Sequence, residues 1–182
     1  MPISQEKRSQ LVSLARSAVA SQVHGRTAPR ADSLDGILGE KRGCFVTLTN
    51  QGRLRGCIGT FRPDRPLGEM IVEMGRAAAR DPRFVGDRIT PSELEELDVE
   101  VSVLSPLTET DQPEQLEIGE HGIYVVAPQG AGCFLPEVAT EMGWNAEQFL
   151  SHCCRSKAGL PPDAWKDPRV KVYLFTTEKF GG

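Results

Sequence analysis

The residues best suited to chemistry lie in one short run, residues 54–61, where two glycines bracket a lone cysteine. In a regular strand, the side chains of Arg55 and Cys57 would point to the same face. A nearby guanidinium favours the thiolate, the form in which cysteine acts as a nucleophile or metal ligand. The run therefore predicts a site in which Cys57 is a nucleophile or redox thiol and Arg55 binds a carboxylate or phosphate. Gly56 and Gly59 would let a ligand approach the backbone closely.

Each of these residues also has a structural explanation. Free cysteine is among the most buried residue types, so the two glycines and Cys57 could equally serve to let a helix pack tightly on the strand. Arg55 could form an internal ion pair with the acidic segment that follows it, for example with Asp98 or Glu100. Both interpretations of the run stay open at this point.

Two residues outside the run are further candidates. His121 lies in a predicted loop and could act as a base toward the thiol of Cys57, although most histidines in such loops are solvent-facing turn residues. Glu137 lies near a predicted helix start, where the helix dipole favours a carboxylate, and a role in ligand binding is the alternative. Arg80 and Arg83 flank the end of another predicted helix, where cations complement the dipole.

Composition describes a soluble globular chain of 182 residues, which is the size of one domain. Its N-terminal residues lead into an amphipathic segment and not into the apolar core of a secretory signal, which predicts a cytoplasmic protein. The five cysteines are an odd number, so reduced thiols are expected. No cysteine pair has CxxC spacing and the three histidines form no cluster, so neither a metal site nor a cofactor is predicted.

Charge is distributed unevenly along the chain. Residues 51–90 contain eight arginines and five acidic residues, whereas residues 91–120 contain ten acidic residues and no lysine or arginine. The acidic segment is either a solvated face or a docking surface for a basic partner. The net charge of -4 argues against binding to nucleic acid or to a membrane surface.

Hydrophobic spacing predicts the elements that must position these residues. Helices are expected at 4–24, 67–80, 136–142 and 145–158, with a short one after Thr90. Strands are expected at 44–49, 54–61, 99–103, 122–127, 133–135 and 170–176. Residues 25–43 are irregular and either fold over a cleft or contain a short helix. Strands gathered into hairpins, with no βαβ rhythm, predict an α+β fold with a largely antiparallel sheet flanked by helices.

From about residue 45 to residue 180 the sequence resembles the AMMECR family. The resemblance rests on FVTL at 45–48, LRGCIG at 54–59, AAARDPRF at 77–84, LEELDVEVSVLSP at 94–106, GEHG at 119–122, LPEVA at 135–139 and AGLPPDAW at 158–165. It implies one α+β domain, spanning residues 1–182, with a larger and a smaller lobe and a cleft near the LRGCIG segment. It also implies a functional link to a Memo-like protein and a radical-SAM-type enzyme, beside or fused to which prokaryotic relatives tend to occur.

Two hypotheses about function follow. In the first, the chain is an enzyme that binds a small anionic ligand in the cleft, with Cys57 as nucleophile or redox thiol, Arg55 as anion clamp and His121 as base. In the second, it is a non-catalytic adaptor or accessory subunit that docks a Memo-like or radical-SAM-type partner, through the acidic residues 91–120. Binding of RNA or DNA would have to rely on the local arginines of residues 53–65, against the acidity of the whole chain.

Overall fold

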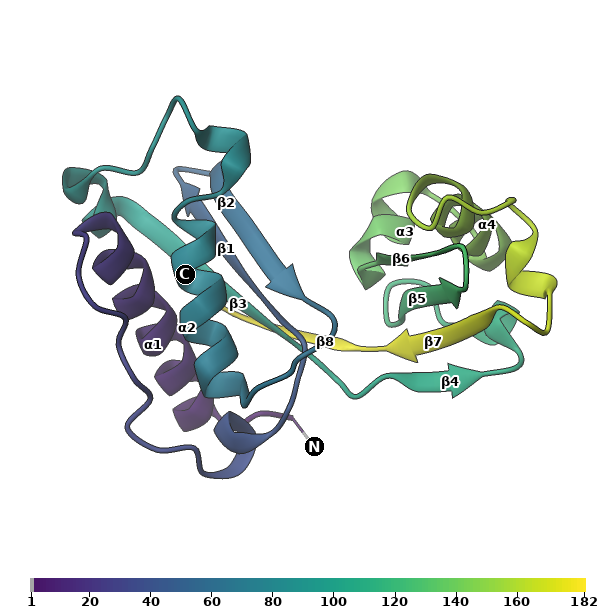
Figure 1. Cartoon of the computed structure of the whole chain (residues 1–182), viewed down its shortest axis with the longest axis horizontal. Helices are drawn as coiled ribbons and strands as arrows, with labels where there is room; N and C mark the ends of the chain where they lie inside the picture. Colours follow the sequence, from purple (N-terminus) through teal and green to yellow (C-terminus); the bar gives the residue numbers. More distant parts are fainter. Residues whose placement is uncertain (1) are drawn as a thin grey trace. The chain divides into compact units, whose positions relative to one another are not determined.

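The computed structural model describes residues 2–182, and the chain divides into two compact units. Unit 1 comprises residues 1–104 and 178–182, and unit 2 comprises residues 105–177. Each unit has a four-stranded sheet and a hydrophobic core of its own. Figure 1 shows the chain completing most of unit 1 first, then forming unit 2, and returning to unit 1 with its last strand.

Unit 1 is a sheet in the order β2-β1-β3-β8 with two helices packed on one face (Figure 1). Its strands are β1 (Cys44–Asn50), β2 (Arg53–Thr60), β3 (Leu97–Leu104) and β8 (Thr177–Gly181), and its helices are α1 (Gln5–Val23) and α2 (Leu67–Ala78). Strand β1 pairs antiparallel with both β2 and β3. Alternate residues of β1, Val46 and Leu48 among them, are fully buried against the helices, which is why this face carries the core.

The ends of the helices follow ordinary capping chemistry. Ser4 caps α1 by accepting a hydrogen bond from the backbone N–H of Lys7, 3.4 Å away. In unit 2, Asn145 and Gln148 form a reciprocal capping box at the start of the second helix, as their spacing predicts.

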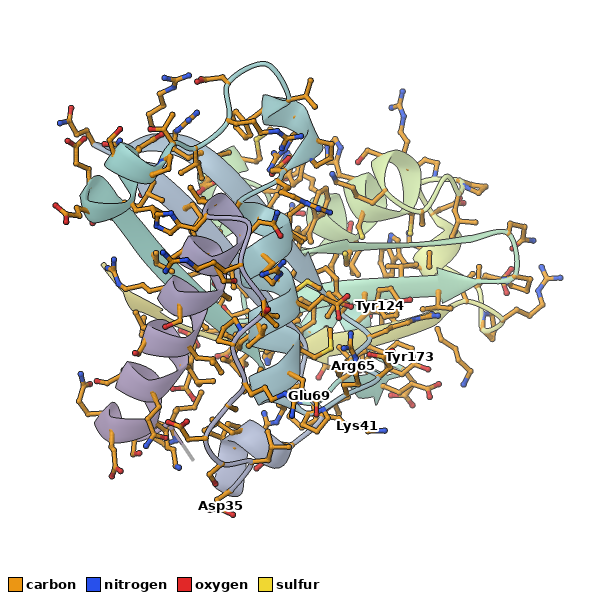
Figure 2. The ribbon with its side chains drawn as sticks, turned by 60° about the vertical axis from the view of Figure 1, so that its left-hand side comes forward. Asp35, Lys41, Arg65, Glu69, Tyr124 and Tyr173 are labelled. Carbon is orange, nitrogen blue, oxygen red and sulfur yellow. The ribbon has the colours of Figure 1, made fainter. Side chains whose placement is uncertain are left out.

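Unit 2 has a sheet in the order β4-β7-β5-β6. Its strands are β4 (Thr108–Thr110), β5 (Gly122–Ala127), β6 (Gly130–Phe134) and β7 (Lys171–Phe175), and its helices are α3 (Pro136–Met142) and α4 (Ala146–Ser156). Its core combines aliphatic, thiol and aromatic side chains, and the rings of Phe134 and Phe149 stack with centroids 5.6 Å apart. Tyr124 and Tyr173, both labelled in Figure 2, are partners across β5 and β7 with ring centroids 6.1 Å apart.

The α+β fold is confirmed, and the differences from the sequence prediction are local. The sequence predicts one sheet, whereas the structure has two. Residues 170–181 form two strands, β7 and β8, and these belong to different sheets. Residues 25–43 contain a short 3-10 helix, η1 (Gly36–Gly39), and residues 105–115 contain β4 and η4 (Pro113–Gln115). Three further 3-10 helices are η2 (Pro82–Phe84), η3 (Pro91–Glu96) and η5 (Ala164–Lys166).

The helix predicted after Thr90 is the 3-10 helix η3, and its first turn has no side-chain cap. The side chain of Thr90 makes no capping hydrogen bond, while the carboxylate of Glu93 binds Arg55. None of the helices within residues 2–182 combines the length and the apolar character that crossing a membrane requires.

Candidate functional site

Cys57 lies in the middle of β2, on the sheet face that α1 and α2 do not cover. It pairs with Thr47 of β1, whose neighbours Val46 and Leu48 point into the core. The Cys57 Sγ lies 3.2 Å from the Oγ1 of Thr47, a hydrogen bond in which either atom could donate. The thiol is half-buried. Cys57 is therefore not part of the hydrophobic core of unit 1.

The backbone of Cys57 is held on both sides by an ion pair just beyond α2. The buried carboxylate of Asp81 accepts the Cys57 N–H at 3.0 Å, and Arg83 Nη2 donates to the Cys57 carbonyl at 3.2 Å. Asp81 and Arg83 also bind each other, with Oδ2 and Nη2 2.5 Å apart. The short segment 81–83 thus fixes the position of the strand that carries the thiol.

The electrostatics of this pair follow from its hydrogen bonds. The hydrogen bonds from the Arg83 guanidinium are the main cause that holds the pKa of Asp81 well below its usual range. Hydrogen bonds from the backbone N–H groups of Cys57 and Arg83 act in the same direction, and burial acts in the opposite one. The same contact raises the pKa of Arg83. Asp81 therefore stays ionised and Arg83 stays charged next to Cys57.

The two glycines of the run are explained by packing within unit 1. A methyl group at Gly56 would overlap the carbonyl oxygen of Ala78, where α2 ends against β2. A methyl group at Gly59 would overlap the ring of Phe45. Protein atoms fill the space over both glycines, which is the structural alternative that the sequence left open.

Arg55 is not positioned as an open anion clamp. It is 4% exposed, and its guanidinium donates to Glu93 through Nε at 2.6 Å and Nη2 at 3.1 Å, and to Asp87 Oδ2 through Nη1 at 3.0 Å. The hydrogen bond with Glu93 is the main cause that raises the pKa of Arg55, and the same contact lowers the pKa of Glu93. The internal ion pair is thus what the structure shows, with Glu93 and Asp87 as partners in place of Asp98 or Glu100.

Arg55 lies at a β-bulge, which interrupts the regular alternation of side chains along β2. The pairing of β2 with β1 passes from Gly56 opposite Leu48 to Leu54 opposite Thr49, so Arg55 is the extra residue. A bulge re-aims the side chain that it carries. The regular alternation that predicted Arg55 beside the thiol therefore does not hold here, and Arg83 is the cation in contact with Cys57.

His121 and Glu137 belong to unit 2. His121 closes a turn before β5: its Nδ1 accepts the N–H of Glu117 at 3.0 Å, and its own N–H donates to the Glu117 carbonyl at 3.0 Å. Glu137 lies half-buried in the first turn of α3. The base role of His121, the ligand role of Glu137 and the cleft between two lobes stay predictions.

Burial disfavours the thiolate form of the other four cysteines. All five cysteines are free. Burial raises the pKa of Cys44 to about 12 and that of Cys133 to about 11, and it also raises the pKa values of Cys153 and Cys154. Within residues 2–182, no group of three or more His, Cys, Asp or Glu side chains could hold a metal ion.

Comparison with known proteins gives the family. A family model described as AMMECR1 matches residues 12–180. The chain belongs to the AMMECR1 family. The match includes most of α1, well before residue 45, where the resemblance in the sequence began.

Several archaeal proteins have similar sequences. A protein of Methanothermobacter thermautotrophicus is 41% identical over 187 residues, covering 98% of this chain and 96% of the relative. A protein of Methanopyrus kandleri is 45% identical over 179 residues, covering 93% of this chain and 86% of the relative. The crystal structure of an uncharacterized protein from Pyrococcus horikoshii superimposes with a TM-score of 0.83 at 38% identity, covering 98% of this chain and 93% of that one.

The sequence did not single out three residues that build this site. The position of Thr47 beside Cys57 could have been predicted from the hairpin, in which Thr47 of one strand pairs with Cys57 of the other. Thr47 also lies on the same face of its strand as residues 45 and 49. From the sequence, Asp81 is only a residue at the end of a predicted helix, and Arg83 complements the dipole of that helix. The signal for both is an Asp followed two residues later by an Arg at the start of a 3-10 helix, where Asp81 also accepts the N–H of Arg83 at 3.0 Å.

Proposed function

We propose that this AMMECR1-family protein is a cytoplasmic thiol enzyme that binds a small anionic molecule and uses Cys57 as its nucleophile or redox thiol. The observation that carries the proposal is the fixed position of Cys57, between Thr47 at the sulfur and the Asp81–Arg83 pair at the backbone. A reacting group that is held in place by its surroundings loses little freedom when the substrate binds.

Arg83 takes the role that the sequence gave to Arg55. Its side chain is 56% exposed, so it can reach a ligand while it stays paired with Asp81. Its hydrogen bonds to Asp81 and Cys57 use the backbone N–H, Nε and Nη2. The Nη1 group is thus the part of the guanidinium that would bind an anionic substrate. The free state of all five cysteines supports a reducing compartment such as the cytoplasm.

Selective alkylation of Cys57 tests the proposal. The native protein is treated with iodoacetamide and digested, and the modification of each cysteine is measured over time. Cys57 should react at least about tenfold faster than the other four, whose thiolate forms burial disfavours. After unfolding in urea, all five rates should converge. A Cys57 that reacts only after unfolding would remove the basis of the proposal.

The charge of the reagent tests the role of Arg83. Iodoacetate carries a negative charge and iodoacetamide does not, so the ratio of their rates at Cys57 reports the local potential. Arg83→Gln should lower this ratio by about threefold or more. Arg80→Gln is the matched control, because Arg80 is an exposed arginine of the same segment. An equal ratio in all three proteins would exclude Arg83 as the anion-binding group.

His121→Ala tests the predicted base in the same assay. Because Nδ1 of His121 is engaged by the backbone of Glu117, we expect both rates at Cys57 to stay within about twofold of those of the unmodified sequence. A decrease of about tenfold in both rates would instead support the base role.

A second candidate is an adaptor that docks a Memo-like or radical-SAM-type partner. The observation in its favour is that Glu95, Glu96 and Asp98 are exposed side by side on η3 and β3. The acidic segment is divided between the two units, with residues 91–104 in unit 1 and residues 105–120 in unit 2. An adaptor should bind its partner in a salt-sensitive manner that survives Cys57→Ser and fails when Glu95 and Glu96 are both changed to lysine.

A further inference from the structure

A cavity of about 560 Å³ lies in unit 1 between residues 28–34 and one face of α2. None of its lining residues belongs to the β1-β2 hairpin that carries Cys57. Pockets for small molecules commonly have volumes of about 300–1,000 Å³. The cavity is therefore large enough for a small molecule, and it does not depend on the function proposed for Cys57.

One face of α2 forms a wall of this cavity. Glu69, Val72, Glu73 and Arg76 all line it, at the spacing of three and four residues that places side chains on one side of a helix. Figure 2 labels Glu69 together with Arg65, which precedes the helix and lines the same cavity. Val72, only 8% exposed, supplies the apolar part of this wall.

The opposite wall is held against α2 by packing. A methyl group at Gly68 would lie 3.1 Å from the side chain of Leu34 and 3.2 Å from that of Ala31, so the segment rests directly on the helix. Leu34, which is 41% exposed, is one of the few large apolar side chains that unit 1 leaves open to solvent. The cavity is thus preformed, with apolar surface on both walls.

The charges around the cavity do not cancel. Arg65 forms an ion pair with Glu73. Arg76, by contrast, is held by two neutral groups, with Nη1 2.6 Å from Ser21 Oγ and 3.0 Å from the carbonyl oxygen of Arg26. Arg30 is exposed. Within residues 2–182 neither Arg76 nor Arg30 is paired with a carboxylate. Among the residues that line the cavity, Glu69 is the one acidic side chain outside the Arg65–Glu73 pair.

We infer that this cavity binds a small organic anion with an apolar body. Arg76 and Arg30 bind the anionic group, and Val72 and Leu34 contact the apolar body. Arg76 is the stronger contributor, because its hydrogen bonds to Ser21 and Arg26 fix one edge of the guanidinium and leave the other edge for the ligand.

Two fluorescent probes with related ring systems separate charge from apolar contact. 1-Anilinonaphthalene-8-sulfonate carries a sulfonate, and N-phenyl-1-naphthylamine has the same rings without it. Titration of the folded protein at pH 7 should show saturable binding of the anionic probe at one site. Arg76→Gln should weaken this binding about tenfold and Arg30→Gln about threefold, as expected for the loss of a charge-assisted hydrogen bond from a side chain that is held in place and from one that is exposed.

The controls make the outcome decisive. Arg155→Gln removes the same charge from an exposed position on α4, outside the cavity, and should leave both probes unaffected. The neutral probe should bind Arg76→Gln and Arg30→Gln within about twofold of the unmodified sequence. If Arg76→Gln does not fold, Arg30→Gln decides, because its exposed side chain supports no other contact. The inference is overturned if the anionic probe does not saturate, or if Arg155→Gln weakens it as much as the cavity variants do.

Discussion

Unit 1 and unit 2 bury different kinds of side chain. Within residues 2–182, the buried polar and charged residues are Ser21, Arg55, Asp81 and Ser102, and all four belong to unit 1. Unit 2 buries aliphatic, aromatic and thiol groups, among them Phe149 and the adjacent Cys153 and Cys154. One unit is therefore organised in part by charges inside it, and the other by apolar packing.

The ion pairs of unit 2 lie at its surface. Lys171 and Glu109 are both about half-exposed, and Arg169 pairs with Asp167 while its own side chain is 88% exposed. Solvent screens pairs of this kind, so they contribute little to the stability of the fold. In unit 1, Arg55 and Asp81 instead connect β2 to residues 81–93, which contain little regular structure. Buried charge holds this irregular segment, and Cys57 with it, in addition to the packing of Ile89 in the core of unit 1.

The largest effect should come from Arg55→Leu. Removing this guanidinium leaves the half-buried Glu93 without its cationic partner, with Asn50 as its remaining side-chain donor. This loss should lower the free energy of unfolding by about 3–5 kcal/mol. Urea unfolding followed by circular dichroism measures the loss. Both tryptophans, Trp144 and Trp165, lie in unit 2, so their fluorescence shows separately whether unit 2 is affected.

Arg53→Leu is the matched control for this prediction. Arg53 contacts the same Asp87 carboxylate, but its side chain is 68% exposed. Its loss should cost less than about 1 kcal/mol. Equal losses for Arg53→Leu and Arg55→Leu would show that burial does not determine the contribution of these pairs. If Arg55→Leu moves the unfolding midpoint measured by tryptophan fluorescence to the midpoint measured by circular dichroism, the two units unfold together.

Periodicity predicted the elements of both units well, because the α+β fold depends mainly on which residues are apolar. The paired strands at 44–60 and 122–134 and the helix ends at Ser4 and Asn145 follow from alternation and capping chemistry. The two-sheet division could not be read in the same way, since one apolar run at 170–176 gives no sign that the chain changes sheets beyond it. Sheet assignment depends on contacts between residues far apart in sequence.

The candidate site shows the same limit at the level of single residues. The run around Cys57 was recognised from its residue types, but the bulge at Arg55 changes which cation lies beside the thiol. A bulge is set by the partner strand and not by the residue itself. Asp81 and Arg83 were visible as a helix end, and only their tertiary contacts to Cys57 give them a second role.

Asp81→Asn should reveal the buried charge of unit 1 through its pH dependence. The pKa of Asp81 is lower in the folded than in the unfolded protein, so its ionised carboxylate stabilises the fold above pH 4 and loses this contribution as the pH falls toward the folded pKa. At pH 7 the variant should be less stable by about 2–3 kcal/mol, the range for hydrogen bonds to a charged group. The difference should stay constant down to about pH 5 and narrow below pH 4.

Asp167→Asn provides the comparison from unit 2. Arg169 lowers the pKa of Asp167 to about 2, but this pair lies at the surface. Its variant should show a much smaller difference from the unmodified sequence over the same pH range. A difference for Asp81→Asn that widens on acidification would contradict the assigned direction of the pKa shift.

The smallest of these effects concerns a feature that the two units share. Each has a glycine on an outer strand of its sheet against which the end of a helix packs. Gly56 meets Ala78, the last residue of α2, and Gly132 meets Lys157 and Ala158, which follow α4. A methyl group at either position would overlap backbone atoms, so alanine should cost about 1–3 kcal/mol in each unit. Gly86→Ala, whose methyl group would contact nothing within 4 Å, should change stability by less than about 0.5 kcal/mol.

The two glycine variants should nevertheless differ in their readouts. Gly132→Ala should move the tryptophan transition, because the disturbed contact lies in the unit that holds both tryptophans. Gly56→Ala should leave that transition in place and raise the alkylation rate of Cys57, since residues 78–83 that fix the thiol would have to shift. A Gly56→Ala protein that is destabilised yet alkylated at the unchanged rate would mean that the Asp81–Arg83 pair, and not the helix contact, holds Cys57 in position.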